Sequence, residues 1–233
     1  MSSHLEPPFR NRVIRATRPE AQAFLAARME TRQLEAGCVL YDKSQGFTHA
    51  IFPHAGILSL MSEMSEGRSV EKTSIGNEGF LGFTYPMGGL ISTSRTVVRV
   101  PGYASWLAMS DLDEAMQRFV CVRDVMLGYS RAQVIQLMET VACNALHSAE
   151  QRVSRWLLHA YDRQDGEDFP LTQKAISEVL GMRRATISQA CSVLLKSGAI
   201  TYSRGKVSIL NRNILQRHAC DCYERVTAAS LPR

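Results

Sequence analysis

The sequence predicts an α+β fold with three successive parts: an N-terminal all-β sandwich or barrel, one long helix, and a C-terminal helical module closed by a β-hairpin. Three observations lead to this prediction. Ten of the fifteen glycines lie between Gly37 and Gly102, glycine nearly disappears after Ser110, and the net charge of +5 arises after residue 146, because 14 basic and 14 acidic residues balance before it. We expect parts at residues 1–110, 111–146 and 147–233.

The first part is predicted to be β-rich because its glycines keep the spacing of strands and turns. The first five recur every nine to eleven residues, and short apolar or alternating runs accompany them. These runs are residues 38–41, 50–52, 57–61 and 96–100, which favours a sandwich or barrel. A single helix over residues 19–29 is expected before them, with Phe24, Leu25 and Met29 facing inward.

The middle part is predicted to be one long helix. Ser110 and Asp113 resemble a capping box, and from Leu112 the apolar residues keep helical phase over roughly thirty positions. Those positions are Met116, Phe119, Met126, Val134, Leu137 and Val141. A helix of this length needs a partner, either a second copy of the chain or its own β part. We expect a symmetric dimer on residues 111–142, with Phe119 and Met126 in the interface.

A second capping box, Ser148 and Gln151, predicts another amphipathic helix that begins just after His147. Its apolar face comprises Val153, Trp156, Leu157 and Ala160. The helix should end before an acidic loop at residues 162–168, and Phe169 with Pro170 then interrupts the chain.

Residues 172–196 have the pattern of two helices joined at a glycine. Thr172 can cap the first helix, Ile176 and Leu180 form its buried face, and Gly181 permits the tight turn. In the second helix Met182, Ile187 and Leu194 face the same core. This leaves an exposed helix start comprising Arg183, Arg184, Ala185, Thr186, Ser188 and Gln189. A recognition helix presents such residues to base edges in the major groove, while the preceding helix contacts the DNA backbone.

Two short β-like runs, 199–202 and 206–210, follow and predict a winged hairpin with Arg204 and Lys206 at its tip. Residues 171–212 hold seven basic side chains against one acid, Glu178, which favours a polyanionic partner over an ordinary basic surface. Phosphate contacts are expected from Lys174, Arg204 and Lys206. The complete predicted DNA-facing set is Thr172, Gln173, Lys174, Arg183, Arg184, Ala185, Thr186, Ser188, Gln189, Arg204 and Lys206.

The order of β-roll, long helix and winged helix-turn-helix resembles the Crp/Fnr superfamily of bacterial transcription regulators, with residues 172–200 and the wing carrying the likeness. The resemblance implies a cyclic-nucleotide-binding-like β-roll (jelly roll) and a dimerising helix. It also implies a cytoplasmic homodimer on an inverted-repeat operator of double-stranded DNA. Further expectations are RNA polymerase as a partner, no membrane association, no cofactor and no catalysis.

Departures from the family pattern bear on the ligand. Arg95 and Thr96 match the family's phosphate-binding pair, although Arg95 also fits a solvated strand arginine. The ribose-binding glutamate is missing because Phe83 follows Gly82, and each unpaired ribose hydroxyl would cost about 1 to 3 kcal/mol. Cyclic AMP and cyclic GMP are therefore not expected to bind. No cysteine precedes Cys38, so the N-terminal iron–sulfur cluster of the oxygen-sensing branch is not expected either.

The recognition helix also departs from the commonest family pattern. Ala185 and Gln189 replace an acid and an arginine. Arg184 can still bind guanine through O6 and N7, and Gln189 can pair with adenine. The operator should therefore differ from the family's common sequence.

Other functions remain as alternatives. The β-roll could sense a small molecule or haem through His49 or His54, or the chain could be a cupin-like metalloenzyme, although these histidines lack the short His-x-His arrangement with a following glutamate. Cys220 and Cys222 form a C-x-C pair that we interpret as buried or idle thiols. The first residues do not resemble a signal peptide and no run is long enough to cross a membrane, so secretion is not expected.

Overall fold

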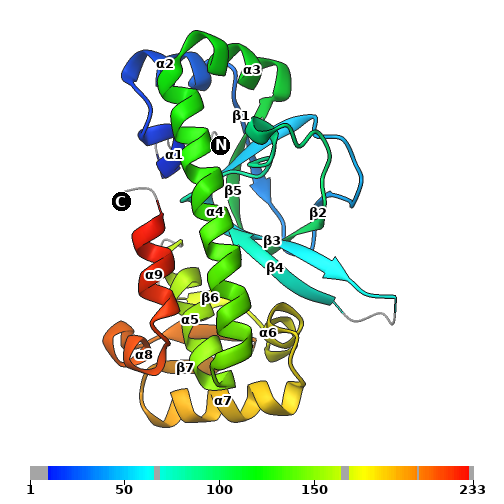
Figure 1. The fold of residues 1–233 in the computed structure, drawn as a ribbon. Helices are drawn as coiled ribbons and strands as arrows, with labels where there is room; N and C mark the ends of the chain where they lie inside the picture. The colour runs from blue at the N-terminus through cyan, green and yellow to red at the C-terminus, as the bar shows by residue number, and fades with distance from the viewer. Residues whose placement is uncertain (1–9, 66–68, 164–167, 204, 231–233) are drawn as a thin grey trace, which may run out of the picture.

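The computed structural model describes residues 10–65, 69–163, 168–203 and 205–230. It has the α+β architecture that the sequence predicts (Figure 1). A β-rich N-terminal part lies beside the upper half of the long helix α4, Val120–Leu146, and a helical C-terminal part surrounds its lower end. None of the helices in the described part of the chain combines the length and apolar character that a membrane span requires.

A five-stranded antiparallel sheet forms the N-terminal part, in the order β1-β5-β3-β4 with β2 also paired to β5. The strands are β1 Glu30–Leu34, β2 Val39–Tyr41, β3 His49–Glu63, β4 Ser69–Ile75 and β5 Arg95–Ala108, and the 3-10 helix η2 Tyr85–Met87 precedes β5. All four predicted runs fall on strands. The runs 50–52 and 57–61 belong to one strand, however, and β1 and β4 are largely polar strands that the apolar pattern does not reveal.

Strand β3 is continuous because Gly56 bends it rather than ending it. Gly56 has a φ of 97°, and a Cβ added there would lie 2.8 Å from the carbonyl oxygen of Val100. Gly102 opposes it on β5, where a Cβ would lie 2.2 Å from the carbonyl oxygen of Ala55. The pairing register shifts at this point. Beyond the bend, Ile57 and Val100 join the core of the C-terminal part.

Two helices precede the sheet, α1 Arg12–Arg15 and α2 Pro19–Ala26. The prediction of a helix from Pro19 is confirmed, with Phe24 and Leu25 buried. The helix ends before Met29, which lies half-buried at the start of the sheet.

The predicted single helix is in fact two, and this corrects two expectations. Helix α3, Met109–Arg118, begins directly after β5 with Ala108 as its N-cap, so Ser110 does not cap it. Phe119 then takes an extended conformation, with φ −124° and ψ 104°, before α4 begins. This break lets the Phe119 ring pack edge-on against Phe24, with ring centroids 5.4 Å apart. The helix therefore starts two residues earlier than a cap at Ser110 would place it, and its first residue, Met109, is buried.

Two large cores hold the described residues together. The first joins the sheet, α2, α3 and the first half of α4, and it includes Met126 and Tyr129. Met126 is completely buried and Phe119 packs against this core. The expectation that these two side chains form a dimer interface is therefore wrong, because they stabilise their own chain.

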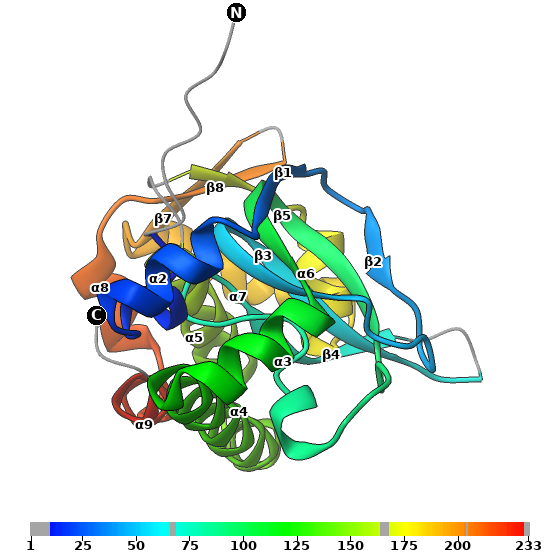
Figure 2. The ribbon, with the colours of Figure 1, turned by 90° about the horizontal axis from the view of Figure 1, so that it is seen from above.

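The C-terminal part is a winged helix followed by two more helices. Its elements are α5 Ala149–Asp162, β6 Asp168–Pro170, α6 Gln173–Leu180, α7 Arg184–Lys196, β7 Ile200–Ser203, β8 Lys206–Ile209, α8 Arg212–His218 and α9 Cys222–Ala229. The predicted capping box of Ser148 and Gln151 is confirmed. Phe169 and Pro170 form a third strand, β6, paired with β8, rather than a simple interruption. Helix α9 lies beside α4 in both views (Figures 1 and 2).

Candidate nucleic-acid interface

Helix α6 forms as the sequence predicts. The Thr172 side chain accepts a hydrogen bond from the backbone N–H of Ala175 at 3.0 Å, which satisfies one of the free donors at the helix start. Gly181 ends the helix in the left-handed conformation, with φ 63°. Ile176 and Leu180 are buried as predicted. The two helices of the motif are thus joined by a tight turn.

Helix α7 exposes its first turns at the end of the molecule farthest from α2 and α3 (Figure 1). Ile187, Ala190, Cys191 and Leu194 bury the opposite face. The DNA-facing residues predicted on this helix are exposed, namely Arg183, Arg184, Ala185, Thr186 and Gln189, while Ser188 is half-buried. The backbone N–H groups at this start have no side-chain cap, so donors and positive charge face the same direction.

The arginines at the start of α7 are not committed to internal ion pairs. Within the described residues, neither Arg183 nor Arg184 lies within 4.0 Å of a carboxylate. Glu178, the one acid of this module, instead pairs with Arg99 of β5 at 3.3 Å and lies 4.0 Å from Lys174. The guanidinium groups of α7 therefore remain available to an external anion.

The predicted wing is the hairpin β7–β8. Ser203 pairs with Lys206 across its turn, and Gly205 has a φ of 78°. The backbone N–H of Leu171 donates to the carbonyl of Gly205 at 2.9 Å, which fixes the turn beside the start of α6. Lys206 is exposed, while Arg204 lies outside the described residues.

Residues near the start of α6 lie on the same side as the wing. The backbone N–H of Gln173 donates to the Tyr202 hydroxyl at 3.2 Å. Lys174 is 78% exposed, and its one ion pair among the described residues is a long contact with Glu178, so its ammonium can bind phosphate. The start of α6 thus lies beside the wing, and the role of the predicted residues in DNA contact stays a prediction.

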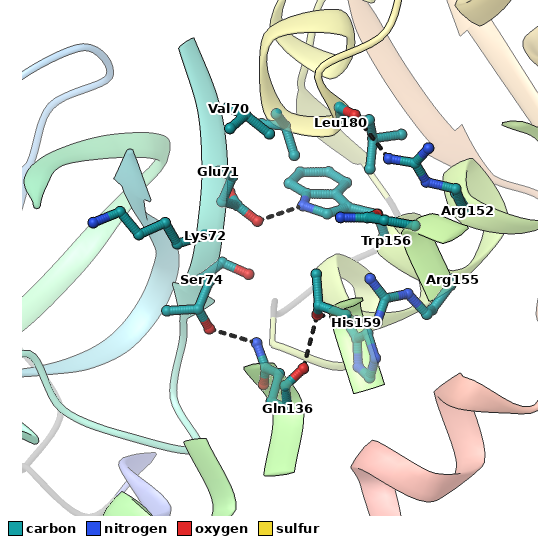
Figure 3. Close-up of a pocket in the computed structure, with 14 residues that line it drawn as sticks. Val70, Glu71, Lys72, Ser74, Gln136, Arg152, Arg155, Trp156, His159 and Leu180 are labelled. Carbon is teal, nitrogen blue, oxygen red and sulfur yellow. Dashed lines mark hydrogen bonds between the residues drawn. The ribbon is translucent and has the colours of Figure 1, made fainter. Parts of the chain in front are cut away.

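The orientation of this module is set by polar contacts between α5 and β4. Trp156 points from α5 to β4 and donates through Nε1 to Oε1 of Glu71 at 3.0 Å (Figure 3). The other carboxylate oxygen of Glu71 accepts from Ser59. Nearby, Arg152 donates to the carbonyl of Leu180 at 2.8 Å. These contacts join the sheet, α5 and α6.

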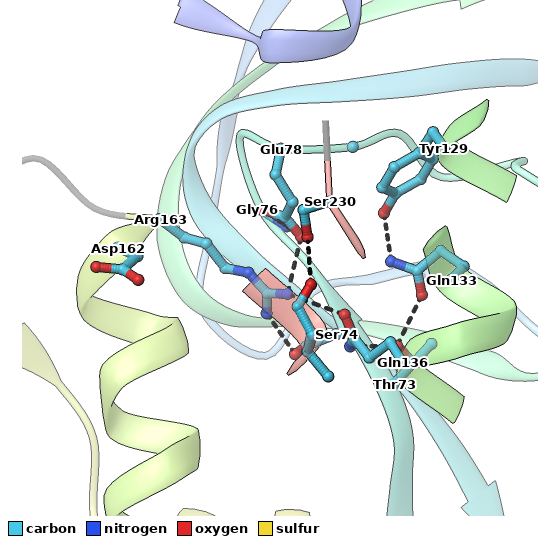
Figure 4. A network of polar contacts seen from close by, with 12 residues as sticks. Thr73, Ser74, Gly76, Glu78, Tyr129, Gln133, Gln136, Asp162, Arg163 and Ser230 are labelled. Carbon is cyan, nitrogen blue, oxygen red and sulfur yellow. Dashed lines mark hydrogen bonds and ion pairs between the residues drawn. The ribbon is translucent and has the colours of Figure 1, made fainter. Parts of the chain in front are cut away.

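A buried ion pair lies at the far end of α5. Arg163 points between Ser74 and Glu78, donating to the Ser74 hydroxyl at 2.7 Å and lying 2.9 Å from the Glu78 carboxylate (Figure 4). The backbone N–H of Gly76 also donates to Glu78 at 3.2 Å. A Cβ at Gly76 would lie 2.6 Å from the Arg163 side chain, so glycine is required for this close packing.

The second predicted anion site has a different environment. Arg95 is 43% exposed and lies 3.2 Å from Glu63 and 3.6 Å from Asp42. Thr96 is fully buried, and its hydroxyl has no hydrogen-bond partner. Neither residue lines the pockets between the sheet and the C-terminal part. Arg95 is thus partly exposed beside two carboxylates while Thr96 is buried, and phosphate binding by this pair stays a prediction.

Aromatic side chains pack around Phe83, the residue that follows Gly82 in place of the expected acid. Phe83 is buried and its ring meets that of Tyr129 of α4 edge-on, with centroids 6.2 Å apart. Tyr129 also packs against Phe80 at 5.5 Å, and a Cβ at Gly79 would lie 1.9 Å from the tyrosine ring. This packing supports the expectation that cyclic nucleotides do not bind.

The histidines of the sensor alternative are held within the sheet. His54 is 1% exposed, and its Nε2 lies 2.8 Å from the Ser105 hydroxyl. Burial, with a smaller effect of Arg10, lowers the pKa of His54 to about 4. His49 contacts Thr48 through Nδ1 at 3.1 Å. The two histidines thus make separate contacts with the chain itself.

Comparison with known proteins agrees with this geometry. Residues 151–218 match the Crp-like helix-turn-helix domain. The fold is similar to that of FixK2 from Bradyrhizobium japonicum, with a TM-score of 0.70 at 16% identity over 82% of this chain and 98% of that one. It is also similar to the CLP regulator of Xanthomonas campestris (0.61, 12% identity, 83% and 100%) and to a CRP/FNR-family transcriptional regulator from Thermus thermophilus (0.59, 18%, 82% and 98%). No curated protein sequence matches the chain.

The chain therefore contains a Crp-like helix-turn-helix domain and has the fold of Crp/Fnr-type transcription regulators, as the sequence predicts. What sequence reasoning missed are the contacts that orient this domain. Trp156 was predicted as a core residue only, and Arg163 and Glu78 were not singled out. Their separation in sequence leaves no local signal that could have paired them.

Proposed function

We propose that this protein is a transcription regulator that binds an inverted-repeat DNA operator as a homodimer in the cytoplasm. One observation carries the proposal: the first turn of α7 exposes Arg183 and Arg184 without carboxylate partners among the described residues, on the second helix of a helix-turn-helix. Helix α7 enters the major groove, where Arg184 reads guanine and Gln189 reads adenine. Lys174, Arg204 and Lys206 hold the phosphate backbone.

Mapping of the bound sites across the genome, followed by titration of the purified protein onto one site, tests this proposal. We expect enriched sites that share an inverted repeat, with half-site centres roughly 34 Å apart. Binding to a scrambled duplex should be at least about 1,000-fold weaker at the same salt concentration. Equal affinity for both duplexes, or sites without two-fold symmetry, would contradict specific binding by a dimer.

Helix α4 provides the dimer surface in this proposal. Four apolar residues recur at intervals of seven along it and are exposed in the single chain: Val120 at 59%, Leu127 at 39%, Val134 at 44% and Val141 at 72%. Met138 and Leu146 extend this stripe at 67% and 78%. An apolar residue at every seventh position supplies one of the two apolar positions in each heptad of a coiled coil, so a second copy of α4 is the partner that we infer.

Replacing both Val134 and Val141 by glutamate should convert the dimer to monomers, because each charge would be buried without a partner in the interface. Sedimentation velocity at micromolar concentration measures the change. Leu90→Glu is the control, since Leu90 is similarly exposed, at 63%, but lies in the connection before β5. Monomeric unaltered protein, or a double variant that still dimerises, would rule out this face of α4.

The proposal assigns no cyclic nucleotide as effector, because Phe83 rather than a glutamate follows Gly82 in the sequence. Calorimetric titration with cyclic AMP and cyclic GMP should give no binding at low-micromolar concentration. RNA polymerase stays a predicted partner, with no contact residue assigned to it.

A further inference from the structure

Three buried cysteines and one histidine meet beside the junction of α4 and α5. Cys143 and His147 lie one helical turn apart at the end of α4. Cys220 and Cys222 lie on either side of Asp221, the N-cap of α9. Their ligand atoms, one from each residue, all lie within 4.8 Å of one another. The cysteines are at most 5% exposed.

This cluster changes the interpretation of the C-x-C pair. Taken alone, Cys220 and Cys222 are two thiols without further ligands. The fold supplies two further ligands: Cys143, which lies 77 positions before Cys220, and His147, which lies 75 positions before Cys222. A spacing of four residues on a helix places Cys143 and His147 on one face. This face lies against the start of α9, where Cys220 and Cys222 are found.

Two of the distances between the ligand atoms match those around a single tetrahedral ion. Zinc bonds of about 2.3 Å to sulfur and about 2.05 Å to nitrogen place two sulfur ligands about 3.8 Å apart, and sulfur and nitrogen about 3.6 Å apart. Here Cys143 Sγ lies 3.6 Å from Cys220 Sγ, and Cys222 Sγ lies 3.6 Å from Nδ1 of His147. A disulfide would need a sulfur–sulfur distance of about 2.05 Å.

The Asp221 carboxylate lies near the second ring nitrogen of His147. Nε2 of His147, the ring nitrogen that faces away from Cys222, lies 3.7 Å from the Asp221 carboxylate. Metal-binding histidines commonly have such a carboxylate on their second nitrogen, which fixes the ring orientation. Asp221 is itself held by Arg225, which donates to its other oxygen at 2.6 Å.

We propose that Cys143, His147, Cys220 and Cys222 bind one Zn²⁺ ion as a closed Cys3His site. Three sulfur ligands favour a borderline-soft ion over magnesium or calcium, and four protein ligands leave no open position for a catalytic water. As the metal–sulfur bonds form, any proton on the three thiols passes to solvent, and no electrons are transferred.

The ion fastens α9 to the end of α4. His147 is the C-cap of α4, so the site joins the long helix to the segment that follows the wing. A further polar contact between α9 and α4 is the pair Arg225 and Glu139, 3.8 Å apart, in which Arg225 is 60% exposed. Such an exposed pair contributes little, so the metal would add a much stronger polar link to the packing of α9 against α4.

Metal content of the full-length protein tests the proposal directly. The protein is purified with a phosphine reductant and without chelator, and zinc is counted by mass spectrometry of the elements. We expect one zinc ion per chain. Replacement by Co²⁺ should produce the sulfur-to-cobalt charge-transfer absorption and the visible bands of a tetrahedral ion, a result that requires no variant to fold.

Variants then assign the ligands. Cys222→Ser and His147→Ala should lose the zinc on dialysis against a competing chelator, and Cys38→Ser, which changes an exposed cysteine elsewhere, should retain it. Reduced, folded protein that binds neither Zn²⁺ nor Co²⁺ overturns the proposal. So does metal that survives in both ligand variants, or a Cys143–Cys220 disulfide that forms in place of metal binding. These outcomes are independent of DNA binding.

Discussion

The interior of this chain and its predicted DNA-facing surface use arginine in opposite ways. In the interior, Arg163 is 5% exposed and its guanidinium contacts Glu78 and Ser74. At the start of α7, Arg183 and Arg184 are exposed and, among described residues, have no carboxylate nearby. The difference teaches that an arginine's role follows from its burial and its partners. A paired interior arginine holds elements in place, and an unpaired surface arginine is available to bind.

The largest effect should come from breaking the interior pair. Arg163→Met keeps much of the side-chain packing over Gly76 but leaves the Glu78 carboxylate buried without its cation. We expect the free energy of unfolding to fall by about 3 to 5 kcal/mol, as measured by urea denaturation.

A second variant distinguishes the charge from the shape of the side chain. Combining Arg163→Met with Glu78→Leu removes both charges and should restore much of the lost stability, because no ion is left unpaired. If the free energy of unfolding of Arg163→Met differs from that of the unaltered protein by less than about 1 kcal/mol, the pair does not hold α5 against the sheet.

The buried histidine predicts how the interior responds to acid. The pKa of His54 is about 4 in the folded chain, against 6.5 for a free side chain. Between these values the unfolded chain binds more protons, so stability falls as the pH is lowered from about 6.5 to about 4. The shift corresponds to a loss of roughly 3 kcal/mol. His54→Gln should remove this component of the urea-denaturation profile; identical pH profiles for both proteins would contradict it.

On the predicted DNA-facing surface, two variants should fail differently. Arg184→Ala should weaken binding to the operator by about 1 to 3 kcal/mol and relax the preference at one base position. Lys206→Ala should weaken binding to every sequence and reduce the salt slope by about 1. Titrations of both variants on operator and scrambled duplexes at several salt concentrations measure this. Full discrimination retained by Arg184→Ala would show that the helix docks in another way.

Sequence patterns predicted what local chemistry determines. Thr172 and Gly181 mark the ends of α6 because capping and a left-handed turn each depend on one residue type, and Ser148 marks the start of α5 for the same reason. The break at Phe119 could not be predicted, since it depends on Phe24, far away in sequence. The exposed valines of α4 could have been predicted, because their seven-residue spacing is visible in the sequence. The partners of Cys220 and Arg163 are known only once the chain is folded.

The smallest effect is expected at Arg95, the arginine that the family pattern marks as a phosphate ligand. Its partners Glu63 and Asp42 have side chains that are 55% and 68% exposed, so water and salt screen both pairs. Arg95→Ala should therefore change the free energy of unfolding by no more than about 1 kcal/mol, and less at high salt. It should also leave calorimetric titrations with cyclic AMP unchanged, because the unaltered protein is not expected to bind the nucleotide. The opposite result would be that the unaltered protein binds cyclic AMP and that Arg95→Ala abolishes this binding. Arg95 would then exchange its carboxylate partners for a phosphate, and like the arginines of α7 it would be available to bind an anion.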